Sequence, residues 1–179
     1  MNIHPFFVHF PIALLAVYSL LEIGTYVSPA LRRQPWMFPV KAFLLFVGAF
    51  AAFAALVTGG IAGDLIEGTS ARAYILEVHA SFAGVTTLLY IVLAAAYLTC
   101  IGDTLGWGNR IAGLNNPFMR IWSVKKFLAH LVLDTWVLPV LAFLALVGMI
   151  ITGVLGAAIV YGPGIDPFVS FTYHLFWAQ

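Results

Sequence analysis

Apolar residues dominate four long segments of the chain, and shorter stretches richer in polar residues separate them. The four segments cover residues 6–27, 40–62, 78–101 and 137–160. A helix of about 20 mostly apolar residues can cross a bilayer. Nothing alternates with the period of two that a membrane barrel strand requires. The pattern therefore predicts an all-α integral membrane four-helix bundle, with residues 1–179 forming a single transmembrane domain.

Two other segments are not expected to span the membrane. Residues 118–134 are amphipathic, with Trp122 inside and Trp136 just beyond the segment as candidate anchors, so we expect them to lie at the membrane interface. The aromatic tail, residues 165–179, is too short to cross, and we expect it to lie on the outer surface.

The basic residues predict the orientation of the bundle, because Lys and Arg concentrate in cytoplasmic loops. The second connection contains only Arg72, beside several acidic residues. The first and third connections contain seven basic residues: Arg32, Arg33, Lys41, Arg110, Arg120, Lys125 and Lys126. This asymmetry predicts that the first and third connections face the cytoplasm and that both termini lie outside, an N-out and C-out topology.

Composition narrows the possible functions. Of the 179 residues, 63% are hydrophobic and 8% are charged, and the net charge is +1. A soluble domain carries about a quarter charged residues, and nucleic-acid binding requires a basic surface. Both classes are therefore excluded. The single cysteine, Cys100, cannot supply the motif for covalent haem attachment. No phosphate loop or hydrolytic motif is present, which favours a carrier or accessory subunit over an enzyme.

The histidines gather on one side of the predicted bundle. With this orientation His4, His9, His79 and His174 all fall at the outer side. His9 and His79 lie near the starts of the first and third spans, at depths that agree to within a helical turn. Small residues at the same level leave space beside the rings: Ala13, Gly59, Gly63 and Ala83.

This pattern supports more than one kind of site. Two neutral imidazoles facing each other across a bundle suit a non-covalent b-type haem, with His9 and His79 as axial ligands of the iron. Arg72 could then meet a propionate at the outer rim. Imidazole with nearby carboxylates could instead bind zinc or copper. In a third interpretation no cofactor is bound, and the two histidines only join helices.

Short matches suggest an internal repeat of two helical hairpins. Val8-His9 and Val78-His79 begin the inward-running spans, and Thr58-Gly59 and Thr152-Gly153 lie near the outer ends of the outward-running spans. The matches fit a parallel repeat about an axis along the membrane normal. They could also arise by chance in so apolar a sequence.

The other polar residues have ordinary local interpretations. Glu22 is expected to reach the inner interface or to pair with Arg32 or Arg33, and His130 with Asp134 is expected to form a local i,i+4 contact. His4-Pro5 is typical of a helix start. Three tyrosines at helical spacing are expected to be packing residues: Tyr18, Tyr90 and Tyr97.

The N-terminal motif resembles a known family. Residues 3–15, Ile-His-Pro-Phe-Phe-Val-His-Phe-Pro-Ile-Ala-Leu-Leu, are similar to the start of the bacterial family called domain of unknown function 2231 (DUF2231). Thr58-Gly59 with Asp64, and His79-Ala80 with Gly84, are similar to its second and third helices. The resemblance covers roughly residues 1–160 and implies a four-helix membrane protein in a redox setting. The long third connection and the aromatic tail depart from the family.

Together these features predict a multi-pass protein of the bacterial inner (plasma) membrane. It would transfer electrons through one b-type haem near the outer leaflet, within a larger redox complex or with a periplasmic carrier as partner. The alternative is a cofactor-free accessory subunit of a respiratory or photosynthetic complex. A transporter ranks last, because the inner halves of the spans offer almost no polar path.

Overall fold

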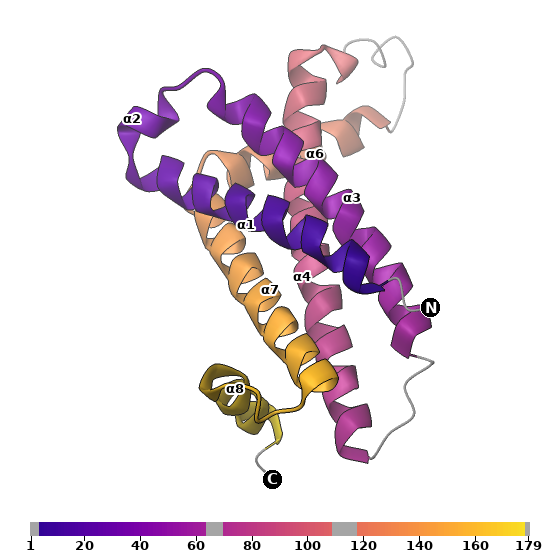
Figure 1. Ribbon diagram of the computed structural model, residues 1–179. Helices are drawn as coiled ribbons and strands as arrows, with labels where there is room; N and C mark the ends of the chain where they lie inside the picture. Colours follow the sequence, from indigo (N-terminus) through magenta and orange to yellow (C-terminus); the bar gives the residue numbers. More distant parts are fainter. Residues whose placement is uncertain (1–3, 64–69, 109–117, 178–179) are drawn as a thin grey trace.

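Four helices of the computed structural model are long and apolar enough to cross a membrane, as the sequence predicts (Figure 1). The structure describes residues 4–63, 70–108 and 118–177. The four long helices are α1 (His4–Val27), α3 (Met37–Gly63), α4 (Ser70–Thr104) and α7 (Val137–Tyr161). The described part of the chain contains helices and no strands, so the all-α prediction is confirmed.

Three further helices lie in the described part of the chain. The short α2 (Pro29–Arg32) lies between α1 and α3, α6 (Phe118–Leu133) precedes α7, and α8 (Pro167–Trp177) follows it. The Ser28 side chain caps α2. The carboxylate of Asp166 accepts the backbone N–H groups of Phe168 and Val169 at 2.8 and 2.9 Å, so it caps α8. Hence α6 and α8 fall within the two predicted non-spanning segments.

The long helices pack as two hairpins. The most extensive contacts join α1 to α3 and α4 to α7, and weaker contacts join α3 to α4 and α1 to α7. The four helices therefore form a ring in which α1 and α4 lie diagonally opposite each other. Following the predicted orientation, we call the end with His4 and Gly63 the outer end, and the end with Val27 and Met37 the inner end.

The helices extend beyond the apolar segments that predicted them. Helix α3 begins at Met37 and α4 covers Ser70–Thr104, where the apolar pattern gave residues 40–62 and 78–101. Apolarity marks the part of a helix that lies in hydrocarbon, whereas the helix itself continues into the polar boundary. One consequence concerns Lys41, which the sequence places in a connection and the structure places on the buried side of α3.

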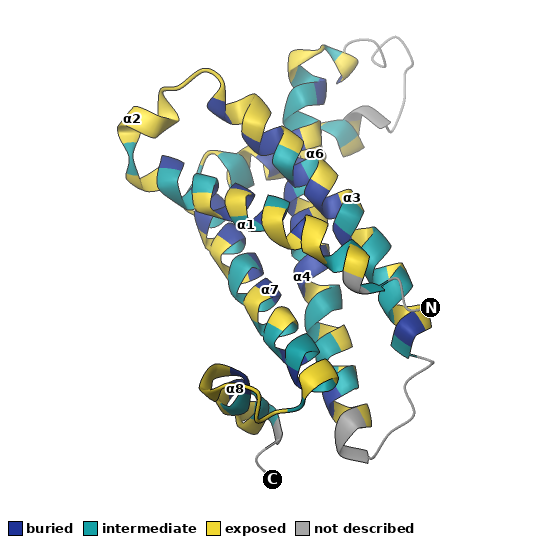
Figure 2. Ribbon diagram, in the orientation of Figure 1, coloured by how far each residue is buried: buried dark blue, intermediate teal, exposed yellow. Residues whose placement is uncertain are grey.

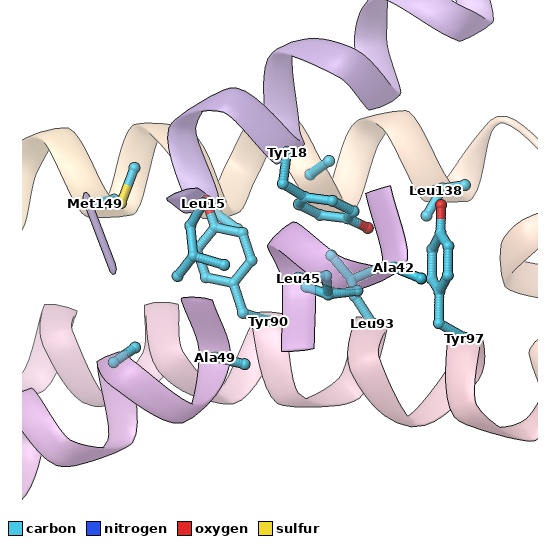
Figure 3. Close-up of a cluster of buried hydrophobic side chains, with 13 residues drawn as sticks. Leu15, Tyr18, Ala42, Leu45, Ala49, Tyr90, Leu93, Tyr97, Leu138 and Met149 are labelled. Atoms are coloured by element: carbon cyan, nitrogen blue, oxygen red, sulfur yellow. The ribbon is translucent and has the colours of Figure 1, made fainter. Parts of the chain in front are cut away.

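The apolar core lies toward the inner half of the bundle (Figure 3). Leu15 and Tyr18 of α1 meet Leu45 of α3 and Tyr90 and Leu93 of α4 there, and all five are at most 1% exposed. The Tyr18 ring packs edge-on against Tyr90 and also against Tyr97, which is itself in the core. The prediction that these tyrosines pack in the interior is confirmed.

The outward faces of the helices are largely exposed (Figure 2). They carry large apolar side chains. Phe10, Phe43, Phe50, Val85 and Phe143 are all more than half exposed. A soluble protein rarely exposes such a continuous apolar surface. The surface of the described chain therefore suits a lipid bilayer, as expected for a multi-pass membrane protein.

Candidate functional site

His79 is held against α7 at the outer end. Its Nδ1 lies 2.9 Å from the backbone oxygen of Thr152. A carbonyl only accepts, so Nδ1 donates the hydrogen, and in the neutral ring Nε2 then carries the lone pair. The ring Cε1 lies 3.3 Å from the position that a Cβ on Gly156 would occupy. Gly156 therefore leaves room for the imidazole to pack closely on α7.

His4 makes a matching contact with α3. Its Nδ1 lies 3.2 Å from the hydroxyl of Thr58. That hydroxyl donates to the backbone oxygens of Ala54 and Ala55, so it accepts from His4. Cε1 of the ring is 3.0 Å from the position of a Cβ on Gly59. Each of the two hairpins thus holds one histidine against a threonine and a glycine.

Burial affects the protonation of His4. Loss of solvent lowers the pKa of His4 below its ordinary value of 6.5, and a hydrogen bond to the Ala55 carbonyl opposes part of this change. The ring is therefore neutral at pH 7. A neutral imidazole is the form that can donate a lone pair to a metal.

The two histidines lie at the same depth on diagonal helices. Near the inner end Tyr97 of α4 donates a hydrogen bond to Glu22 of α1, so these two residues lie at the same depth in the bundle. His4 and His79 each lie eighteen residues toward the outer end from that level. Eighteen residues of helix are about 27 Å on both helices. His4 and His79 are also close enough for charges on their rings to interact.

The structure does not bring His9 and His79 together. The buried side of α1 carries Pro11, Tyr18 and Glu22. At about 100° per residue, His9 lies about 140° around the helix from both Glu22 and His4. His9 and the neighbouring Ala13 are accordingly exposed.

Of the other residues predicted for this site, Gly59 lies beside a histidine ring. Gly59 lies under the ring of His4, whereas Gly63 faces Leu76 of α4. Ala83 is half-buried on α4. Arg72 lies in the first turns of α4, and its side chain is outside the described residues.

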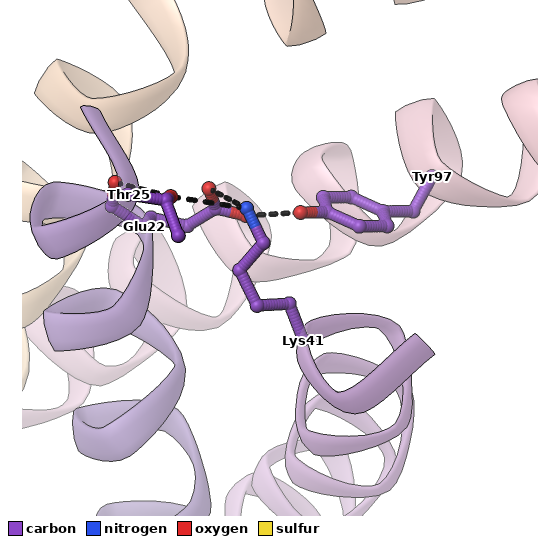
Figure 4. A network of polar contacts seen from close by, with 4 residues as sticks. All are labelled: Glu22, Thr25, Lys41 and Tyr97. Atoms are coloured by element: carbon purple, nitrogen blue, oxygen red, sulfur yellow. Dashed lines mark hydrogen bonds and ion pairs between the residues drawn. The ribbon is translucent and has the colours of Figure 1, made fainter. Parts of the chain in front are cut away.

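A buried ion pair joins α1 and α3 near the inner end (Figure 4). Nζ of Lys41 lies 2.7 Å from Oε2 of Glu22, and it also donates to the hydroxyl of Thr25 at 3.2 Å. Glu22 is 2% exposed and Lys41 is 9% exposed. The expectation that Glu22 pairs with Arg32 or Arg33 is therefore wrong. The cation that pairs with Glu22 lies on the facing helix.

Tyrosine hydroxyls extend this network toward α4. Tyr97 donates to Oε1 of Glu22, as Figure 4 shows, and one level further out Ser19 of α1 hydrogen-bonds with the hydroxyl of Tyr90 at 3.0 Å. The buried hydroxyl of Tyr18 lies near the Glu22 carboxylate, but it makes no hydrogen bond of good distance and angle among the described residues. The interior of the inner half of the bundle is thus more polar than the sequence predicts.

His130 and His174 lie at the surface of the described structure. The expected contact between His130 and Asp134 is confirmed, with Nδ1 and Oδ2 2.9 Å apart. His174 is exposed on α8. The described residues contain no group of three or more His, Cys, Asp or Glu side chains that could hold a metal ion. Any metal or haem iron here would therefore depend on one or two imidazoles.

Comparisons with known protein families, curated proteins and solved structures find no match. The resemblance of residues 3–15 to DUF2231 therefore stays a prediction.

Proposed function

We propose that the chain is an electron-carrier subunit of a bacterial inner membrane that holds one b-type haem at its outer end. The observation that carries the proposal is the pair His4 and His79. They lie at equal depth on diagonal helices, and each is held through Nδ1 by a hydrogen-bond acceptor. Histidines that bind metals commonly donate their other ring hydrogen in this way, which fixes the tautomer and the ring orientation.

The residues of the chain have distinct roles in this proposal. The Thr152 carbonyl and the Thr58 hydroxyl would orient the two rings, and Gly156 and Gly59 would let the rings sit close to α7 and α3. A bound haem would supply a one-electron Fe(III)/Fe(II) couple. The apolar exposed helix faces would keep the site in lipid, beside a larger redox complex or within reach of a periplasmic carrier.

Absorbance spectroscopy on protein purified from its native membranes tests the proposal. A reduced-minus-oxidised difference spectrum should contain the sharp α band of a b-type haem. His79→Ala and His4→Ala should each abolish or shift that band, whereas the matched control His9→Ala should keep it. A flat spectrum from the unaltered protein, or an unchanged band in His79→Ala, would overturn the proposal.

A second candidate function is a cofactor-free accessory subunit. The same contacts favour it in one respect, because His4 on Thr58 and His79 on Thr152 also join the helices of each hairpin. In that case His79→Ala lowers the thermal stability of the protein without any spectral change. The protein should then also co-purify with a larger complex.

A further inference from the structure

Helix α6 has one face that docks on α4 and one face that is unpartnered in the described structure. Trp122 packs over Gly102 and Gly108, and the ring atoms lie 3.0 and 2.6 Å from where a Cβ on each glycine would be. Nζ of Lys126 forms an ion pair with Asp103 at 2.9 Å. Trp122, Lys126 and the buried Ala129 follow one another at helical spacing, so these contacts fix the rotation of the helix.

The opposite face of α6 combines apolar and basic side chains. The exposed apolar residues on it are Ile121, Val124, Phe127, Leu128 and Leu131. A shallow hollow of about 260 Å³ on this face is lined by Arg120, Ile121, Val124 and Lys125.

The two cations at this hollow differ from Lys126. Lys126 is neutralised by Asp103, whereas Arg120 and Lys125 are exposed and make no ion pair among the described residues. Two positive charges therefore flank two apolar side chains. That arrangement matches a ligand with a negative headgroup and an apolar tail.

We infer that this face of α6, which includes Arg120, Ile121, Val124 and Lys125, binds an anionic phospholipid. The guanidinium and the ammonium groups would hold the phosphate, and the acyl chains would cover Ile121 and Val124. The site lies at the inner end of the bundle, because α6 contacts α4 near Gly102 and Asp103. This inference goes beyond the proposed function and is independent of any cofactor.

Native mass spectrometry of the purified, delipidated protein tests the inference. The protein is titrated with phosphatidylglycerol or with phosphatidylcholine, and bound lipid is counted. We expect clear preference for phosphatidylglycerol. A basic residue near a membrane surface contributes about a fivefold change in affinity for anionic lipid. The double variant Arg120→Gln/Lys125→Gln should therefore bind phosphatidylglycerol about 25-fold more weakly.

Two further variants keep the outcome interpretable. Arg32→Gln/Arg33→Gln removes the same charge at the same end of the bundle, and it should leave the affinity essentially unchanged. Ile121→Ser/Val124→Ser keeps both cations but should weaken lipid binding, because a lipid also needs the apolar surface for its acyl chains, whereas a free anion does not. Thermal melts show whether each variant remains folded.

Several results would overturn the inference. Equal binding of the two lipids, or an unchanged affinity in Arg120→Gln/Lys125→Gln, would show that the face does not recognise an anionic headgroup. Displacement of the lipid by inorganic phosphate would indicate a simple anion site. A stable dimer that Phe127→Ser separates would indicate that a second copy covers the face.

Discussion

Lys41 of α3 and Glu22 of α1 form a 2.7 Å ion pair inside the part of the bundle that crosses the membrane. Their side chains are 11% and 1% exposed, respectively. Charged groups at such depth are costly unless they are paired and hydrogen-bonded. Thr25 and Tyr97 provide the additional hydrogen bonds, so the four residues act as one network linking α1, α3 and α4.

Removing one partner of this pair should strongly destabilise the fold. In Lys41→Ala the Glu22 carboxylate remains buried without its cation, and the free energy of unfolding should fall by about 3–5 kcal/mol. The uncharged double variant Glu22→Gln/Lys41→Met should recover most of that loss. Unfolding by denaturant in mixed micelles measures both values.

The exposed ion pair of Lys126 with Asp103 supplies the control. Its side chains are 45% and 30% exposed. Lys126→Ala should therefore cost no more than about 1 kcal/mol. If Lys41→Ala were as mild as Lys126→Ala, burial of the Glu22 carboxylate would not depend on its cation.

Two tyrosines in the same core should respond differently to loss of the hydroxyl. Tyr97 donates to the Glu22 carboxylate, so Tyr97→Phe should lower the free energy of unfolding by about 1.5–3 kcal/mol. The buried hydroxyl of Tyr18 lies near the same carboxylate but makes no hydrogen bond of good geometry, so Tyr18→Phe should cost clearly less than Tyr97→Phe. Equal losses in the two variants would contradict the network drawn in Figure 4.

The sequence predicts the four spans because the number of apolar residues needed to cross a bilayer is a strong local signal. It does not give the rotation of each helix. On α1 the difference between His4 and His9 is one of rotation, and the inward side becomes known only once Tyr18 and Glu22 are placed in the core. The 3.6-residue period through these two residues includes His4 and excludes His9.

Lys41 shows a second limit of sequence analysis. Counting basic residues by connection assigned it to a cytoplasmic loop, because it lies only one residue inside the predicted span. The depth of Lys41 along its helix nevertheless indicates its partner. Glu22 lies five residues from the inner end of α1, and Lys41 lies four residues from the inner end of α3. Opposite charges at equal depth on neighbouring antiparallel helices predict a pair, which the loop count conceals.

In the cofactor-free protein, burial of His4 should make the stability of the fold depend on pH. Because the pKa of His4 is lowered in the folded protein, the unfolded chain binds a proton more readily. This contribution to stability is present above the ordinary value of 6.5 and is lost as the pH falls below it toward the lowered pKa. The melting temperature should accordingly fall with acidification across that range.

Two variants test whether His4 causes this pH dependence. His4→Gln should flatten the decline, since the residue no longer titrates, whereas His9→Gln should keep most of it because His9 is exposed. Thermal melts at several pH values below and above 6.5 measure the decline in melting temperature for each variant. A decline that persists unchanged in His4→Gln would assign the effect to another group.

Two glycines of α3 should respond in opposite ways to an added methyl group. A Cβ on Gly48 would lie 2.6 and 2.7 Å from Cδ2 and Cγ of Leu15, and Leu15 is 1% exposed and cannot move aside. Gly48→Ala should therefore separate α1 from α3 and cost about 1–3 kcal/mol. A Cβ on Gly60 would meet nothing within 4 Å. Because alanine favours helix over glycine by up to about 1 kcal/mol, Gly60→Ala should be neutral or stabilising. Thermal melts of the two variants compare the effects directly, and a larger loss in Gly60→Ala than in Gly48→Ala would contradict the close packing of α1 on α3.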